Sequence, residues 1–462
     1  MLRILLAVFL LCMGCDPPLD TRSALIVQTM VDADRDLIAS RPQLVADKYE
    51  KMASGLQPFL RGSAQLFYRD LSRYRDSQGS VLHGKGAEFV RLYGDIHLEN
   101  LGATFDVEGP LFDVIDFDAT THGPFGWELR RAALSLSVAL SVAAVSPQNR
   151  QEVIRQLGRS YVQEVLKKSQ QDVLTADVIR AGFPTESRIV TELLQDGQKR
   201  NEQQEEITQY TEWKDGARRF VRNAEQQDLP SHWAAELPSM IREYRRNRHA
   251  GRGEDASFVI VDAIQRFGSG VASLPNLRFW VMVQGTRTGA AQQSPQGEWL
   301  LELKEERDPP FPTEWLGRGT LGTNAQRVFL GALELSASAT SEADLGHVLY
   351  GGVSFQVRRV LRGRRDLDVA RLAERIASGR YVQRDLLDLG WIIGKLLAAG
   401  HAKNGNARAI ADVLTQQDLD GTAVIEALIA ASVLDEQRLN QDLFLFQEAI
   451  LRRGPLLGAR IP

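Results

Sequence analysis

Cysteine is nearly absent from the sequence. The only two, Cys12 and Cys15, stand within the first fifteen residues. The remaining chain has no thiol that could form an internal disulfide, a thiolate metal cage or a cysteine nucleophile. Enzyme classes that depend on these groups are therefore excluded for a mature chain that has lost this leader.

An excess of charge of one sign is also missing. The formal net charge is −4 over 462 residues, so no global field favours nucleic acid as a partner. With 44% hydrophobic and 25% charged residues, the composition is that of a soluble globular protein with about two or three packed units. Two local basic clusters, "RNRHAGR" and "RRVLRGRR", are interpreted as solvated helix faces.

The apolar run near the start is too short to span a bilayer. It extends from Ile4 to Leu11, follows Arg3 and precedes Gly14 and Cys15, which is the layout of a secretory signal. Residues 1–15 resemble a bacterial lipoprotein signal peptide, in which Cys15 becomes the lipidated first residue. Asp16 resembles the signal that retains lipoproteins in the inner membrane. We expect a lipid anchor at the periplasmic face of the cell envelope. The alternatives are an uncleaved anchor or a misassigned start codon, which would leave the protein cytoplasmic.

The rest of the chain divides by its residue pattern. Apolar residues from Trp127 onward recur at helical spacing and predict a buried amphipathic helix, and Leu386, Leu389 and Leu396 mark another helical face. Residues 150–250 are rich in Gln, Glu, Lys and Arg and predict a solvent-facing helical section. After about residue 255, β-rich runs predict a small antiparallel sheet with a Gly/Ser/Pro/Gln-rich hairpin loop.

The segment "GDIHLEN" and the downstream "VIDFD" contain the residue types that phosphoryl transfer needs. A proton acceptor, oxygen ligands for Mg²⁺, a cation and a flexible loop suffice for this chemistry. In this interpretation Asp95 is the base, Asn100 is a metal ligand, and Asp116 or Asp118 supplies the carboxylate. Lys304 on "WLLELK" is the cation. The loop that covers the phosphates is "FGSGVAS", with Gly268, Ser269 and Gly270.

Each part has a simpler reading. Asp95 and Asn100 could cap a turn, Asp116 could cap a strand end, and a single "GSG" is usually a plain turn. A GDxHxxN string is nevertheless expected by chance only about once in a thousand chains of this length. We interpret His97 as structural, with its ring bonded to loop backbone. "HLE" also matches His-x-Glu of the zinc deaminases, but their Pro-Cys-x-x-Cys half is absent.

These residues resemble those of two families. "GDIHLEN" followed by "VIDFD" is similar to the catalytic loop and metal-binding strand of the aminoglycoside phosphotransferase and choline kinase branch of the kinase-like fold, with Tyr93 where that branch usually has His. More closely, the chain resembles the bacterial family of domain of unknown function 2252. The shared segments are "FLRGSA" (59–64), "GDIHLENLG" (94–102), "DVIDFDATTHGPFGWELRRAALSL" (113–136), "GSGVASLPNLRFWV" (268–281), "LELKE" (301–305) and "AAGHAKNGN" (398–406).

The resemblance implies an α+β, two-lobed, protein-kinase-like fold that is mostly helical with a small antiparallel sheet lobe. The catalytic loop precedes the lysine strand, the reverse of ordinary kinases, so the arrangement would be circularly permuted. We expect four parts: the signal peptide (1–15), the catalytic-loop part of the large lobe with a helical section (16–254), the small nucleotide-binding lobe (255–365) and the C-terminal part of the large lobe (366–462).

The resemblance also implies roles for particular residues. Asp95 would be the catalytic base, Asn100 and Asp116 the Mg²⁺ ligands, and Lys304 the phosphate-binding lysine. Glu334 is the helical candidate to pair with that lysine. Arg61 and Arg278 match family positions without an assigned mechanism.

Three functions follow from these observations. The first is a Mg²⁺- and ATP-dependent phosphotransferase that acts on a small molecule. An exported lipoprotein would face a compartment essentially without ATP, which favours the second, a catalytically inactive kinase-like binding module at the envelope. The third is a metal-dependent hydrolase that uses the carboxylates of Asp95, Asp113, Asp116 and Asp118.

Overall fold

The computed structural model describes residues 21–73, 82, 89–106, 108–171, 178–180, 187–203, 205–249, 256–268, 270–287, 297–312, 322–342, 344–360, 363–403, 406–416, 418 and 420–461. The predicted lipidation site Cys15, Ser269 of the glycine loop and the predicted hairpin loop at 288–296 lie outside these residues. None of the helices in the described part of the chain combines the length and the apolar character needed to cross a membrane.

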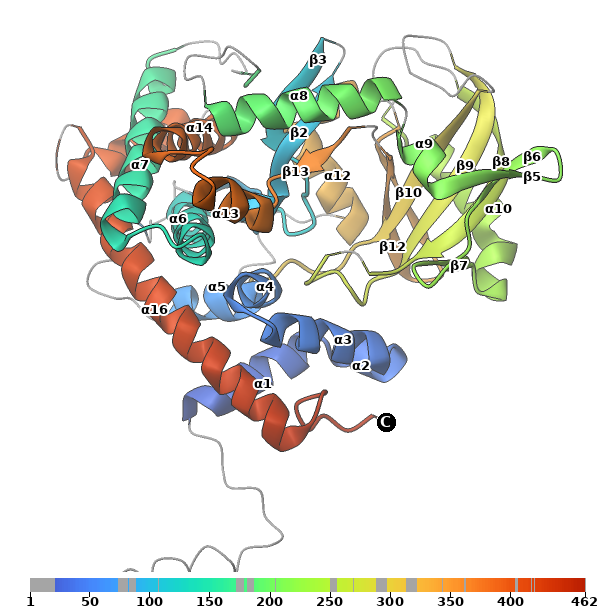
Figure 1. Ribbon diagram of the computed structural model, residues 1–462, viewed down its shortest axis with the longest axis horizontal. Coiled ribbons are helices and arrows are strands. Elements are labelled where there is room, and N and C mark those ends of the chain that lie inside the picture. Colours follow the sequence, from blue (N-terminus) through green and yellow to red (C-terminus); the bar gives the residue numbers. More distant parts are fainter. Residues whose placement is uncertain are drawn as a thin grey trace, which may run out of the picture.

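A six-stranded antiparallel sheet in the order β11-β12-β10-β9-β8-β7 forms one side of the molecule (Figure 1). Its strands are β7 (Gln226–Asp228), β8 (Ala256–Arg266), β9 (Arg278–Arg287), β10 (Glu298–Glu305), β11 (Gly346–Tyr350) and β12 (Val353–Arg359). One face packs on α10 (Ser231–Arg246), through alternate residues that include Leu301 and Leu303. Because side chains alternate along a strand, Glu302 and Lys304 point to the other face.

Smaller elements complete this side. They are α9 (Glu205–Tyr210), the hairpin β5 (Thr211–Lys214) and β6 (Ala217–Phe220), α12 (Asn324–Leu335) and η2 (Ala339–Ser341). Since β7 pairs with β8 and α10 packs on the sheet, the sheet unit begins before residue 255.

Helices form the rest of the molecule. They are α6 (Phe125–Val142), α7 (Pro147–Ser169), α8 (Arg188–Gln203), α13 (Val369–Ala377), α14 (Gln383–His401), α15 (Ala407–Leu414) and α16 (Thr422–Arg453). Small Ala and Ser residues let neighbours approach α6 from every side, and nearly all of its residues are buried. α7 buries Val153, Leu157 and Tyr161 against α14, so the prediction of a solvent-facing section at 150–250 is wrong for this helix.

Five short helices at the start of the described chain pack against its last helix. They are α1 (Thr21–Ala33), α2 (Arg35–Ser40), α3 (Pro42–Ala53), α4 (Leu56–Gly62) and α5 (Ala64–Arg73). Their apolar sides meet α16 through aromatic contacts of Tyr49 and Phe59 with Phe446. In Figure 1 these blue helices lie below the rest of the fold, beside the red α16.

Two small strand groups lie between the helices and the large sheet. β1 (Phe89–Leu92) pairs with β4 (Thr121–Pro124), and β2 (Leu101–Asp106) pairs with both β3 (Gly109–Val114) and β13 (Arg365–Asp366). The short helix η1 (Leu98–Asn100) leads into β2. Helices together with antiparallel sheets confirm the predicted α+β class.

Candidate functional site

The two motif segments meet because the β2–β3 hairpin joins them. β2 starts directly after "GDIHLEN", and its antiparallel partner β3 ends directly before "IDFD". The Ile115 N–H donates to the carbonyl of Asn100 at 2.9 Å. The hairpin therefore places the end of the first motif beside the start of the second.

The turn before Asp95 requires a glycine and a buried acceptor. Gly94 has a φ of +90°, and a Cβ there would lie 1.9 Å from the carbonyl oxygen of Ala119. The fully buried Glu128 carboxylate on α6 accepts the N–H groups of Tyr93 at 3.0 Å and Gly94 at 2.6 Å. The backbone of this turn is thus fixed by the glycine itself and by one side chain from α6.

Glu128 belongs to a buried network that the sequence analysis missed. Its Oε2 lies 2.7 Å from His401 Nε2 at the end of α14, and His401 Nδ1 lies 3.0 Å from the Tyr161 hydroxyl on α7. Glu128 lies in the stretch predicted to form a buried helix and His401 in "AAGHAKNGN", and the network gives each of these polar residues a partner. A Glu and a His within otherwise apolar helical stretches were the available signal, because buried polar groups need partners.

The Asp95 carboxylate is oriented by a buried arginine. Arg131 on α6 donates to Asp95 Oδ1 from Nε at 2.9 Å and from Nη2 at 2.7 Å, and Nη2 also donates to the carbonyl of Leu60. Asp95 Oδ2 accepts no hydrogen bond from the residues that the structure describes. Burial raises the pKa of Asp95, and the Arg131 charge only partly offsets that rise.

Asn100 presents an oxygen, whereas His97 makes fewer contacts than predicted. The Asn100 Nδ2 donates to the carbonyl of Asp95 at 2.9 Å, which leaves Oδ1 available as a ligand. The predicted bond between the His97 ring and loop backbone is wrong. Its Nδ1 is buried without a partner among the described residues, and its Nε2 lies 4.0 Å from Asp95 Oδ2. Burial lowers the pKa of His97 well below its usual value.

Lys304 contacts both aspartates of "IDFD". Its Nζ lies 3.0 Å from each Asp116 carboxylate oxygen and 2.6 Å from Asp118 Oδ1. A separation above about 15 Å would have ruled out a shared nucleotide, and these distances are far shorter. Asp118 N–H also donates to Asp116 Oδ1 at 3.4 Å. The strand lysine and the aspartates of "IDFD" therefore form one cluster.

The surroundings of Asp116 and Asp118 shift the pKa values of their carboxyl groups in opposite directions. Burial alone would raise the pKa of both, but the Lys304 ammonium and the Arg358 guanidinium hold the pKa of Asp116 well below its usual range. Burial and the neighbouring Asp116 charge raise the pKa of Asp118 to about 6. Burial also raises the pKa of Glu306 well above its usual value, next to the Asp118 charge. Near neutral pH, Asp116 is the most strongly ionised member of the group.

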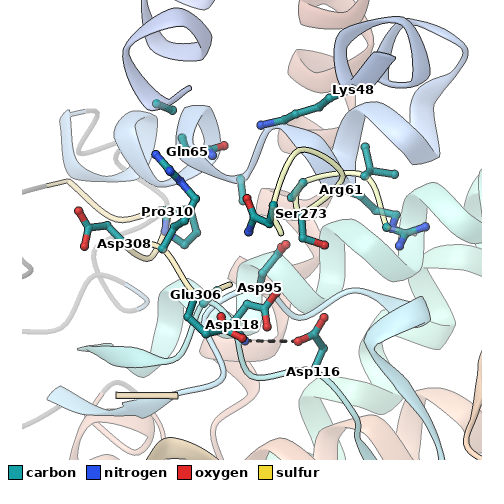
Figure 2. A pocket seen from close by; sticks show the side chains of 18 of the residues that line it. Lys48, Arg61, Gln65, Asp95, Asp116, Asp118, Ser273, Glu306, Asp308 and Pro310 are labelled. Carbon is teal, nitrogen blue, oxygen red and sulfur yellow. Dashed lines mark hydrogen bonds between the residues drawn. The ribbon is translucent and has the colours of Figure 1, made fainter. Parts of the chain in front are cut away.

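A cavity of about 150 Å³ brings most of the predicted site residues together. Its wall includes Lys48, Arg61, Asp95, Asn100, Asp116 and Asp118. Figure 2 shows Asp95, Asp116, Asp118 and Glu306 on one side, with Lys48 and Arg61 reaching from the N-terminal helices on the other. A larger cavity of about 790 Å³ shares Gln65, Glu306 and Arg307 with it.

Lys304 and the glycine loop relate to this cavity in different ways. Lys304 does not line it, because Asp116 and Asp118 stand between its ammonium and the open space. Gly270 does line it, with a φ of +77°, and its carbonyl accepts a hydrogen bond from Lys51 at 2.9 Å. Gly268, with a φ of +79°, is not part of the wall.

The oxygen atoms present fit Mg²⁺ better than a metal that needs several protein ligands. Within the described ranges, no group of three or more His, Cys, Asp or Glu side chains is arranged to hold a metal ion. Mg²⁺ is usually held by one or two carboxylates with amide oxygens, water and substrate phosphates. Asn100, Asp116 and Asp118 line the same cavity and carry oxygen atoms of these two kinds.

The remaining predicted residues have other partners. Glu334 pairs with Arg91 at 3.0 Å and not with Lys304, so its expected pairing with the lysine is wrong. Arg61 pairs with Glu99 at 2.6 Å at the cavity wall.

Arg278 and Asp113 stand away from the cavity wall. Arg278 pairs with Glu302 at 3.1 Å on the sheet. Asp113 accepts hydrogen bonds from the Ser336 hydroxyl and the Ala337 N–H and does not line the cavity. The cluster of four carboxylates expected for a hydrolase is therefore not assembled.

Comparison with known families gives a match to the family described as "Uncharacterized protein conserved in bacteria (DUF2252)", over residues 40–449. The chain belongs to this family. The DUF2252 match includes Asp95, Asn100, Asp116 and Lys304 together with Glu128 and His401, and it leaves out residues 1–39. No curated protein and no solved structure gives a significant match to this DUF2252 chain.

Proposed function

We propose that this protein is a Mg²⁺- and ATP-dependent phosphotransferase with a circularly permuted, kinase-like fold, acting on a small-molecule acceptor. The observation that carries the proposal is the contact of Lys304 with Asp116 at 3.0 Å. A strand lysine contacts a carboxylate that follows a hairpin and is far from it in the sequence, and this carboxylate lines a cavity that also presents Asp95 and Asn100. These are the groups that position and neutralise phosphates in kinases.

The side chains have distinct roles in this proposal. Asp95 accepts the proton of the acceptor hydroxyl through Oδ2, since Arg131 occupies Oδ1. Asn100 Oδ1 and Asp116 would hold Mg²⁺, which neutralises charge on the phosphates when bound. Lys304 contributes positive charge from behind the carboxylates of Asp116 and Asp118, and the helices that carry Lys48 and Arg61 form the opposite wall of the cavity.

The volumes of the two adjoining cavities are consistent with one ligand that occupies both of them. About 150 Å³ accommodates the reacting groups, whereas small-molecule sites usually measure about 300–1,000 Å³. The adjoining cavity of about 790 Å³ has enough space for the rest of a small ligand. Its wall contains both arginines and carboxylates, among them Arg69 and Arg73 with Asp32 and Asp308, and is therefore strongly polar.

The order of the elements supports the permuted arrangement. In this proposal α14 takes the place of the helix that precedes the catalytic loop in other kinases. His401 at its end contacts Glu128, which in turn holds the turn before Asp95. The helix is thus tied to the loop in space, although it follows it by about 300 residues in the chain.

The test is a comparison of variants in Mg-ATP binding and turnover, with protein that begins after Cys15. Mg-ATP should raise the melting temperature of the parent protein, because a ligand that binds the native state stabilises it. Asp116→Asn should abolish this rise. Asp95→Asn should keep it while slowing phosphoryl transfer by about 10²–10⁴-fold. Asp228→Asn, at an exposed aspartate on β7, is the control and should change neither. The proposal fails if Mg-ATP stabilises neither the parent protein nor the control.

A second candidate is a catalytically inactive, kinase-like binding module at the cell envelope. The observation that favours it is the position of Lys304, which two carboxylates already neutralise and separate from the cavity. Arg131 likewise engages Asp95. Mg-ATP binding without turnover in the parent protein, together with membrane attachment through Cys15, would support this function over the first.

A further inference from the structure

A third cavity lies among the arginines of the "RRVLRGRR" segment. It has a volume of about 240 Å³, and its wall includes Arg200, Glu302, Arg358, Arg359, Arg364 and Arg365. It shares no wall residue with the cavity of the candidate site or with the larger one beside it. The segment was interpreted as a solvated helix face. Instead, β12 and β13 bring its two ends to one hollow.

The acidic side chains near this cavity are fewer than the arginines that they contact. Glu302 pairs with Arg358 at 2.9 Å and with Arg278 at 3.1 Å. Asp196 lies 3.3 Å from Arg365 and 3.5 Å from Arg371.

The closest acid to Arg364 is Glu342, at 3.7 Å, which is beyond hydrogen-bond distance. Among the residues that the structure describes, Glu302 is the one acid in a wall that also contains Arg200, Arg358, Arg359, Arg364 and Arg365, and Asp196 is shared with Arg200 as well, at 3.5 Å. An excess of positive charge therefore remains at the cavity.

Arg364 shows this excess most clearly. Its Nε is buried and has no hydrogen-bond partner among the residues that the structure describes. Burial and repulsion from Arg358 lower the pKa of Arg364 to about 10, and the Glu342 charge offsets this only in part. A buried donor without an acceptor is costly, so an anionic acceptor at this place would be strongly favoured.

The cavity wall also contains the aromatic side chains of Tyr210 and Trp280. The Trp280 and Tyr210 rings meet edge to face with centroids 4.9 Å apart, and Trp280 Nε1 donates to Glu302 at 3.1 Å. Guanidinium forks match the geometry of phosphate oxygens, and several forks around one hollow favour a phosphate over a single carboxylate. A volume of about 240 Å³ suits a small molecule.

We propose that the arginine cavity, defined by Arg358, Arg364 and Arg365, binds a small phosphate-bearing anion. The site is separate from the proposed catalytic cavity and does not depend on the proposed phosphotransferase activity. Free pyrophosphate serves as the probe because it carries the recognised group and nothing else.

The experiment is titration calorimetry of the full-length protein with pyrophosphate at low salt. The parent protein should bind pyrophosphate, and Arg364→Gln should weaken binding about tenfold or more, because a charge-assisted bidentate contact is lost. Arg364→Lys should fall between them, since it keeps the charge and loses the fork. Arg380→Gln, at an exposed arginine that pairs with Glu192, is the matched control and should bind like the parent.

The other outcomes are equally decisive. Unchanged affinity in Arg364→Gln, or equal weakening in the control, would overturn the proposal. Citrate binding as tightly as pyrophosphate would overturn the phosphate preference, and tighter binding of an RNA oligonucleotide would replace the small anion by nucleic acid. If Arg364→Gln does not fold, Arg365→Gln takes its place, since that side chain is 30% exposed. Asp116→Asn removes a negative charge near Arg358 and should bind pyrophosphate at least as tightly as the parent protein, so a failure of the catalytic proposal remains distinguishable.

Discussion

Arg131 determines which carboxylate oxygen of Asp95 faces away from an ion pair. Both of its contacts go to Oδ1, and the arginine is fully buried on α6, so its position is fixed. The pKa of Asp95 is raised by burial, which makes the carboxylate a stronger base than an exposed aspartate. The remaining Oδ2 therefore combines availability with basicity.

His97 should make the protein sensitive to acid. Its pKa is lowered by burial, so below about pH 6.5 the unfolded chain binds a proton that the folded chain does not. The free energy of unfolding then falls as the pH falls, by up to about 1.4 kcal/mol for each pH unit below 6.5. His97→Gln should lose this part of the slope in urea unfolding measured between pH 7.5 and pH 5.5. Parallel pH profiles for the two proteins would show that His97 is protonated in the folded state.

Individual site residues differ in how far the sequence alone could identify them. Asp95, Asn100 and Asp116 lie close together in the chain, where spacing is informative, and all three line one cavity. Lys304 became a candidate only in combination with the other parts, because a lysine on a strand carries no information by itself. Arg131 and Glu128 act through partners chosen by packing, which no local pattern encodes. Glu334 failed because the register of α12 turns its carboxylate toward Arg91.

At the scale of elements, Glu128 joins α6, α14 and the turn before Asp95. Glu128→Ala would leave the N–H groups of Tyr93 and Gly94 and the ring of His401 without their acceptor inside the protein. We expect a loss of about 3–5 kcal/mol in the free energy of unfolding, measured by urea denaturation. Glu128→Gln keeps one acceptor oxygen and should cost less.

The control for this prediction is Glu448→Ala on α16. That side chain is partly exposed and pairs with Arg452 at 3.4 Å, so its removal should change stability by no more than about 0.5 kcal/mol. If Glu128→Ala and Glu448→Ala lowered the free energy of unfolding equally, Glu128 would not hold α6, α14 and the turn before Asp95 together. Hydrogen exchange at Tyr93 and Gly94 gives a local measure of the same role.

Elements with a strong periodic apolar pattern were predictable from the sequence. The buried side of an amphipathic helix with many polar residues was not. α6, α14 and β10 coincide with the periodic stretches found in the sequence. α7 was predicted to face solvent because its charged and polar residues together outnumber its apolar ones. Its buried side is nevertheless continuous, because α14 covers it.

At the scale of the whole molecule, one segment separates the two cavities. Arg358 in the wall of the arginine cavity donates to the carbonyl of Ile115 at 3.1 Å, and the next residue, Asp116, lines the candidate site. The charge of Arg358 also contributes to the low pKa of Asp116. An anion that engages Arg358 would therefore change the electrostatic field at the proposed metal ligand, which gives the two cavities a direct physical connection.

The location of the protein decides which phosphoryl donor it can meet, and the sequence makes a definite prediction about it. If residues 1–15 are a lipoprotein signal, Cys15 carries the lipid, and cells grown with labelled palmitate should yield labelled protein in the membrane fraction. Cys15→Ser should abolish both the label and the membrane association. Cys12→Ser is the matched control, because it removes a cysteine that the processing would discard, and it should leave both unchanged. Label that persists in Cys15→Ser would refute the anchor. Unlabelled, soluble protein in the parent strain would place the site in the cytoplasm, where ATP is abundant and the objection to the phosphotransferase no longer applies.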